Sequence, residues 1–325
     1  MDSALKFYDK VEQFPTSDIY AYAVYKKGWC WINLGDFKKA LEIFVSVIRM
    51  AQEGKGGNKI QRTALEREAK KDVVKAYARV GGPDKAWEFF QRVGGDFAPK
   101  MMEGLGEIYW EQGMFGDSSK VYRKLIALNI ESPRICEWQN KVVRNTLSQG
   151  TKRDQVQEIQ RLGTAFEKVR TGGNAKKDAL DECRNAYHDT TKELAQIWHK
   201  EAYKTKNPDT YQLVKFVYKE YLDHFGKEKG AYDMAFFYGE VLFYTESWKE
   251  AAEAYTRVVE MDPSPKAKWL KEAAYAAVIS WKNALAIDDS GSGPDEKKKE
   301  DKEFKPRPIP EYQKKMIGAF DTYIK

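Results

Sequence analysis

Histidine is the side chain that most often transfers protons or binds metals near neutral pH, and the chain has only three. His188 and His199 lie eleven positions apart within one predicted helix, which separates them by about 16 Å along its axis. They therefore cannot bind one metal ion together, and His224 belongs to another segment. The sequence also lacks the G-x-S-x-G, H-E-x-x-H and P-loop patterns. We expect no catalytic residue, no metal site and no cofactor.

The three cysteines, Cys30, Cys136 and Cys183, are scattered along the chain. They form neither a C-x-x-C metal pattern nor the spacing of a disulfide framework. Cys30 lies between two tryptophans in a predicted helix, and Cys183 falls on an apolar stripe. A free thiol in such a position packs like a small hydrophobic side chain. We expect three buried, unpaired thiols.

Composition excludes further classes of protein. The 325 residues carry 55 Lys and Arg against 49 Asp and Glu, a net charge of +6 that is not gathered in one block. This balance does not support a nucleic-acid partner, and no pattern indicates a small-molecule substrate. No stretch approaches the ~20 apolar residues of a membrane helix. An aromatic content of 14% argues against disorder, and the modest Gly and Pro counts disfavour an all-β fold.

The helices that would position any site follow a repeated pattern. Between Ala21 and Val47, apolar residues at helical spacing break where Gly35 ends one helix and Asp36 caps the next. This predicts a helical hairpin. In each later copy, a small or medium residue of the first helix lies 12 positions before a small residue of the second, and a large residue follows 4 later. The copies are Val74, Ala86 and Phe90; Gly106, Ser118 and Tyr122; and Gly239, Ala251 and Tyr255.

Gly28, Trp31, Gly35, Ala40 and Phe44 match the 34-residue pattern of the tetratricopeptide repeat family, which the chain resembles. The resemblance implies an all-α fold, a right-handed superhelical solenoid of about seven helical hairpins. Small residues let the two helices of a hairpin approach, and the large ones fill the gap to the next hairpin. Such a solenoid is expected to be a non-enzymatic scaffold.

The match varies along the chain. We expect a partial repeat helix over 1–16, repeats over 17–132, a degenerate hairpin and a long helix over 133–207, repeats over 208–285, a disordered charged loop over 286–310 and a truncated repeat helix over 311–325. The incomplete repeats at both ends lead us to expect a fragment of a longer protein.

In this family the first helix of each hairpin lines a concave groove, where a protein or peptide partner binds. Aromatic anchors beside basic side chains are typical of such surfaces. The alternative is that the aromatic residues pack between hairpins. Tyr25 and Trp29 stand where chaperone-binding members have Lys and Asn, which argues against a chaperone partner. The resemblance places these residues in the groove: Tyr22, Tyr25, Trp29, Asn33, Lys71, Lys75, Arg79, Glu107, Trp110, Phe236, Glu240, Phe243 and Tyr244.

The repeats starting at Ala23 (AVYKKGWCWINLGDFKKALEIF) and Phe216 (FVYKEYLDHFG) are similar to those of bacterial envelope repeat proteins. These include outer-membrane assembly and adventurous gliding-motility lipoproteins. The similarity implies a periplasmic or outer-membrane-associated protein. Its only contact with the membrane would be a lipid anchor, which we expect to be missing from this sequence. The alternative is a cytoplasmic peptide-binding adaptor, which three free thiols would suit.

Overall fold

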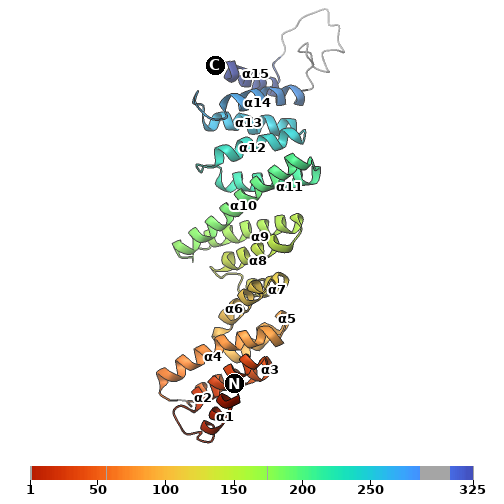
Figure 1. Ribbon diagram of the computed structural model, residues 1–325. Coiled ribbons are helices and arrows are strands. Elements are labelled where there is room, and N and C mark those ends of the chain that lie inside the picture. The colour runs from red at the N-terminus through yellow and green to blue at the C-terminus, as the bar shows by residue number, and fades with distance from the viewer. Residues whose placement is uncertain (1, 56, 174, 286–307, 325) are drawn as a thin grey trace, which may run out of the picture. The chain divides into compact units, whose positions relative to one another are not determined.

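The protein is represented by a computed structural model that describes residues 2–55, 57–173, 175–285 and 308–324. All regular elements in these ranges are helices, which confirms the all-α prediction (Figure 1). The chain divides into two compact units, Met1–Cys183 and Arg184–Lys325. Unit 1 contains α1 (Asp2–Val11), α2 (Tyr20–Leu34), α3 (Phe37–Gln52), α4 (Lys59–Val80), α5 (Pro83–Gly94), a 3₁₀ turn (Gly95–Phe97), α6 (Ala98–Glu111), α7 (Phe115–Leu128), α8 (Ile135–Gln149) and α9 (Lys152–Thr171).

The division between the units falls within α10 (Lys177–Thr205), the long helix that the sequence predicts. Unit 2 then contains α11 (Pro208–Phe225), α12 (Ala231–Tyr244), α13 (Trp248–Met261), α14 (Leu270–Ala284) and α15 (Glu311–Ile324). The predicted loop at 286–310 lies outside the described residues except for its last three. None of the described helices is long and apolar enough to cross a membrane.

Local signals set the helix boundaries. Gly35 ends α2 with a φ of +79°, a left-handed conformation that glycine adopts without strain. Asp36 then accepts a hydrogen bond from the Lys39 backbone N–H at 3.1 Å and caps α3. The longer connection before α4 ends in a capping box, in which Asn58 and Gln61 bond each other's backbone N–H groups. Residues close in sequence therefore mark the end of α2 and the starts of α3 and α4.

A glycine of the first helix lets an aromatic ring of the second approach in three hairpins. A Cβ atom at Gly28 would lie 2.6 Å from the Phe44 ring, and one at Gly106 would lie 2.7 Å from the Tyr122 ring. Gly239 and Tyr255 repeat this contact in unit 2, again at 2.7 Å. These separations are shorter than a packed carbon contact, so each pair requires glycine.

The expectation of three free thiols was wrong. Cys136 at the start of α8 and Cys183 in α10 form a disulfide with a Cα–Cα distance of 5.7 Å, 47 positions apart in the sequence. Cys30 remains a buried free thiol. Spacing patterns detect cysteines that are close in sequence, whereas this pair meets only because the hairpins fold against each other.

Candidate functional site

The side chains predicted for the inner face of unit 1 lie on α2, α4 and α6, and two of those on α2 converge on a carboxylate of α4. Asp72 is only 4% exposed. Its Oδ2 accepts hydrogen bonds from Tyr25 Oη at 2.7 Å and from Trp29 Nε1 at 2.9 Å. Its Oδ1 accepts a third from Lys75 Nζ at 3.0 Å. Three donors offset the hydration that the buried carboxylate has lost.

Tyr25 and Trp29 are therefore half-buried, and their polar atoms are already bonded. Burial, reinforced by the hydrogen bond to Asp72, raises the pKa of Tyr25 to about 12. Lys75 Nζ lies 4.9 Å from the Trp29 ring centroid, which places a cation over that ring. Tyr22, 52% exposed, is the aromatic residue of α2 that keeps a free surface.

An open cleft of about 630 Å³ lies beside this network, between α4, α6 and α8. It brings together three of the predicted residues, Lys71, Lys75 and Glu107, and adds a third lysine, Lys100. We call it the lysine cleft. Its lining consists of Lys71, Val74, Lys75, Phe97, Lys100, Met101, Glu103, Gly104, Glu107, Ile108, Tyr122, Arg134 and Glu137.

The acidic side chains of the lysine cleft are already neutralised by neighbours. Glu103 accepts a hydrogen bond from Trp138 Nε1 at 2.8 Å and forms an ion pair with Arg134. Glu107 accepts a hydrogen bond from Tyr122 Oη at 2.7 Å and pairs with Lys141. Although burial opposes it, these two contacts hold the pKa of Glu107 below its usual value. The carboxylates of Glu103 and Glu107 are thus already bound by side chains of the protein itself.

The lysines of the cleft are less fully engaged. Lys71 pairs with Glu68 at 3.0 Å on the surface of α4, and about half of the Lys71 side chain stays exposed. Lys100 Nζ lies 5.6 Å from the Phe97 ring centroid, and the described residues give it no ion pair. Exposed lysine pairs contribute little energy, so these ammonium groups can turn to a ligand. The cleft therefore suits a partner that carries carboxylates.

Comparisons with known proteins give one family match and similar solved structures. A family model described as tetratricopeptide repeat matches residues 22–50, which cover most of α2 and α3. Residues 22–50 are thus similar to one tetratricopeptide repeat. Among solved structures, the TPR2AB-domain:pHSP90-complex of yeast Sti1 is similar at 13% identity over 69% of this chain and 81% of that chain, with a TM-score of 0.24. No curated protein matches the chain.

A further repeat, α12 and α13 in unit 2, corrects one predicted contact. Phe236 is only 7% exposed, and its ring stacks on that of Trp269 at 4.1 Å, so its assignment as a partner contact was wrong. Trp269 is held in place because its Nε1 donates to Asp233 Oδ1 at 2.6 Å. The segment that precedes α14 covers this part of α12. The sequence of the α12–α13 repeat does not predict this contact, because Trp269 lies outside that repeat.

The other predicted residues of α12 divide between packing and surface. Glu240 accepts a hydrogen bond from Tyr255 Oη at 2.6 Å. Phe243 packs edge to face on Trp248 with ring centroids 5.0 Å apart, whereas Tyr244 is 45% exposed. Tyr244 is thus the predicted residue of this repeat that keeps nearly half of its surface exposed.

The remaining predicted residues of unit 1 do not line the lysine cleft. Asn33 donates to the Trp29 carbonyl one turn earlier in α2 at 2.9 Å. Arg79 lies with its guanidinium 5.6 Å from the Phe37 ring centroid. Trp110 is 44% exposed near the end of α6. They stay predictions for other contacts on the repeat surface.

Asp72 and Trp138 are site residues that sequence reasoning missed. Asp72 falls at helical spacing with Ala69 and Ala76, which are both buried. A carboxylate on an apolar stripe requires bonded partners, and this signal could have identified it. Trp138 carried no such signal, because its partner Glu103 is 35 positions away.

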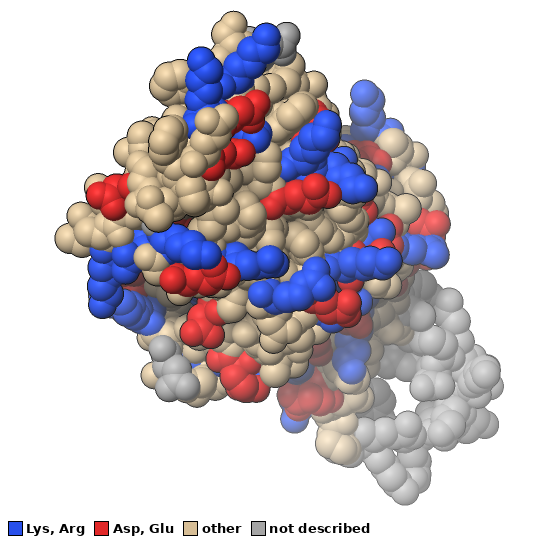
Figure 2. Space-filling model, turned by 90° about the horizontal axis from the view of Figure 1, so that it is seen from below, with Lys and Arg blue, Asp and Glu red and all other residues tan. Residues whose placement is uncertain are grey.

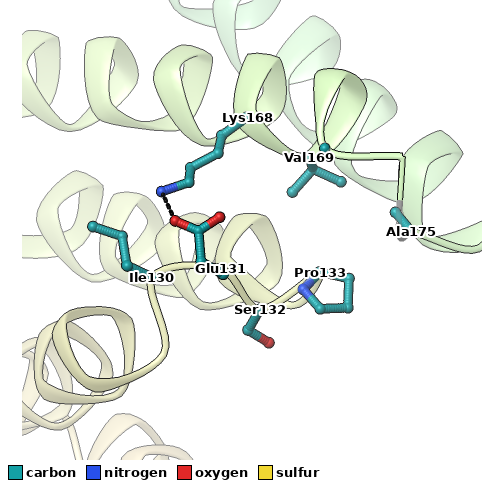
Figure 3. Close-up of a pocket in the computed structure, with 8 residues that line it drawn as sticks. Ile130, Glu131, Ser132, Pro133, Lys168, Val169 and Ala175 are labelled. Carbon is teal, nitrogen blue, oxygen red and sulfur yellow. Dashed lines mark ion pairs between the residues drawn. The ribbon is translucent and has the colours of Figure 1, made fainter.

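A second cavity in unit 1 is too small for a partner. It measures about 50 Å³, enough for one or two water molecules. Figure 3 shows Lys168 of α9 reaching across it to Glu131, and their ion pair measures 2.8 Å.

Figure 2 shows basic and acidic side chains intermingled with uncharged ones on the face in view. The lysine cleft is therefore the stronger candidate in unit 1.

Proposed function

We propose that this protein is a non-enzymatic scaffold that holds a polypeptide partner in the lysine cleft, within a bacterial envelope assembly or motility complex. Tetratricopeptide repeats form a protein-interaction fold, and the cleft adds the chemistry. The observation that carries the proposal is that the acidic side chains of the lysine cleft have partners within the protein, whereas two of its lysines do not have strong ones. Its acidic side chains are paired internally, whereas Lys71 and Lys100 face solvent with weak or no ion pairs.

The apolar part of the lining supports a polypeptide rather than a free anion as the ligand. Val74, Met101 and Ile108 line the cleft together with its charged side chains. A peptide can place an apolar side chain against these three residues while its acidic side chains meet the lysines. A buried apolar centre with a polar rim is the usual anatomy of a protein interface.

The cleft can be tested by crosslinking in cells. A photo-crosslinking amino acid replaces Lys71, and the matched control carries it at Lys124, an exposed lysine of α7. We expect a partner adduct from position 71 alone, and its loss when Lys100→Glu is added or the salt concentration is raised. Equal adducts from both positions, or an adduct that ignores Lys100→Glu, would contradict a lysine-cleft partner.

The Cys136–Cys183 disulfide favours the envelope over the cytoplasmic adaptor as the setting. Disulfides persist in oxidising compartments and are rare in the cytosol. Cells lysed directly into an alkylating agent should yield a chain alkylated only at Cys30. Alkylation of Cys136 and Cys183 in the same sample would indicate the cytoplasmic alternative.

A further inference from the structure

Three tyrosines of unit 2 gather where α10, α11 and α12 meet. The ring centroids of Tyr203 and Tyr244 are 6.0 Å apart in an edge-to-face arrangement, and Tyr211 stacks on Tyr244 at 6.0 Å. Tyr203 is 55% exposed and Tyr244 is 45% exposed, whereas Tyr211 is buried. We call Tyr203, Tyr211 and Tyr244 the tyrosine cage. It presents two open ring surfaces side by side at the surface of the repeat.

The tyrosine cage already holds a cation in this structure. Lys206 Nζ lies 3.9 Å from the Tyr203 ring centroid and 5.0 Å from that of Tyr244. No ion pair joins Lys206 to a carboxylate of the described residues. A tyrosine ring attracts an ammonium or guanidinium group through the negative potential of its face. The Lys206 ammonium group is therefore held by the two tyrosine rings and not by an ion pair.

The backbone explains why Lys206 is the occupant. It adopts a φ of +54° directly after α10, and its N–H bonds the Ala202 carbonyl at 2.7 Å. Asn207 follows and caps α11 through hydrogen bonds to the Asp209 and Thr210 backbone N–H groups. The turn between the two helices thus fixes the start of the lysine side chain beside the rings.

A cavity of about 320 Å³ adjoins the tyrosine cage and shares Tyr203 with it. Burial lowers the pKa of His199 in its wall, which keeps this imidazole neutral near pH 7. The His199 ring packs edge to face on Tyr218 and Phe237, with centroids 5.6 and 5.7 Å apart. Gln196 and Lys200 also line the cavity, but its aromatic residues Tyr203, Tyr218 and Phe237 suit an apolar side chain, and the charge is received by the tyrosine cage.

We propose that the tyrosine cage is a binding site for a lysine or arginine side chain of a partner polypeptide, with Lys206 as its resting occupant. The adjoining cavity takes a neighbouring apolar side chain of that partner. The site selects the opposite charge from the lysine cleft and does not depend on it.

The test uses the full chain and two blocked pentapeptides, with arginine or its neutral analogue citrulline between glycines. Binding is followed by NMR of ring-labelled tyrosine. The arginine peptide should shift the Tyr203 and Tyr244 resonances. In Lys206→Gly, where glycine accepts the positive φ, it should bind about fivefold tighter, because one exposed cation–π competitor is gone. The citrulline peptide should shift neither resonance.

Matched variants separate ring loss from misfolding. Tyr244→Phe keeps the ring and should keep binding, whereas Tyr203→Leu should abolish it with the helical signal unchanged. Tyr22→Leu is the control in unit 1, where Lys26 Nζ lies 5.1 Å from another exposed tyrosine ring, and it should leave binding intact. Binding that survives Tyr203→Leu, equal shifts with citrulline, or no shift in Lys206→Gly would each overturn the proposal.

Discussion

The Tyr122 hydroxyl donates to Glu107 Oε1 at 2.7 Å and joins the second helix of a hairpin to the first, 15 positions earlier. Tyr255 and Glu240 repeat this relationship in unit 2 at 2.6 Å and the same separation. Where the ring is Phe44 or Phe90, the equivalent position holds Trp29 or Lys75 instead of an acid. A glutamate thus accompanies each tyrosine at this point of the repeat. The pair joins the two helices of its hairpin, so its role is structural and needs no partner.

This pairing predicts unequal costs for two matched substitutions. Tyr255→Phe removes the donor that the structure shows for Glu240, and we expect the free energy of unfolding to fall by about 1–2 kcal/mol. Tyr122→Phe should cost less, because Glu107 keeps its ion pair with Lys141. Urea unfolding followed by circular dichroism measures both. Equal losses would contradict this expectation, because they would show that the ion pair with Lys141 does not compensate Glu107 for the lost hydrogen bond.

Two glycines of α6 provide a test of the close approach between helices. Gly106→Ala would place a Cβ 2.7 Å from the Tyr122 ring, so we expect a loss of about 1–3 kcal/mol from overpacking. Gly104→Ala meets Val74 at an ordinary 3.6 Å and should stabilise the helix by about 0.5–1 kcal/mol. Thermal or urea unfolding distinguishes the two, and the idea fails if Gly106→Ala is also stabilising.

The network around Asp72 should tolerate no loss of its acceptor. Asp72→Ala leaves Trp29 Nε1 and Tyr25 Oη without their partner in a buried setting, and we expect a loss of about 2–4 kcal/mol. Glu111→Ala, at an exposed carboxylate of α6, is the control and should change stability by no more than about 0.5 kcal/mol. Similar results for both would mean that the network does not order α2 against α4.

Alkaline pH should destabilise unit 1 through its buried tyrosines. Burial raises the pKa of Tyr25 and Tyr109 from the ordinary 10.0 to about 12, so the folded chain keeps protons that the unfolded chain releases. This contribution is fully present below pH 10 and is lost as the pH rises through about 12. Absorbance at the phenolate band should show delayed ionisation, and Tyr25→Phe should flatten the loss of stability. A single normal titration of all tyrosines would refute this.

The disulfide should contribute strongly to unit 1. Closing a loop between positions 47 apart restricts the unfolded chain by about 4 kcal/mol in the chain-entropy model. We expect reduction by dithiothreitol to lower the unfolding midpoint, and the double substitution Cys136→Ser with Cys183→Ser to lower it by the same amount. A thiol assay in denaturant should find Cys30 alone before reduction and all three cysteines afterwards. Three reactive thiols in the untreated protein would disprove the bond.

Sequence patterns predicted the hairpins well because their signals are local. Gly35 and Asp36 mark the turn between α2 and α3, and the long helix predicted within 133–207 is α10 (Lys177–Thr205). Three of the residues predicted for the groove, Lys71, Lys75 and Glu107, line the lysine cleft. Lys100 and Arg134 joined it only when α6 and α8 came together, since neighbouring hairpins supply the opposite wall.

By itself, the sequence determined that this chain folds into helical repeats, because caps, helical periodicity and glycine–aromatic contacts act within one hairpin. Only the tertiary structure decided which polar atoms are occupied. Trp138 with Glu103, Trp29 with Asp72 and the disulfide join positions 35, 43 and 47 apart. Such pairs depend on how one hairpin is seated on the next. That seating buried Phe236, left Tyr244 open beside Lys206, and separated the residues that pack from those that remain available to a partner.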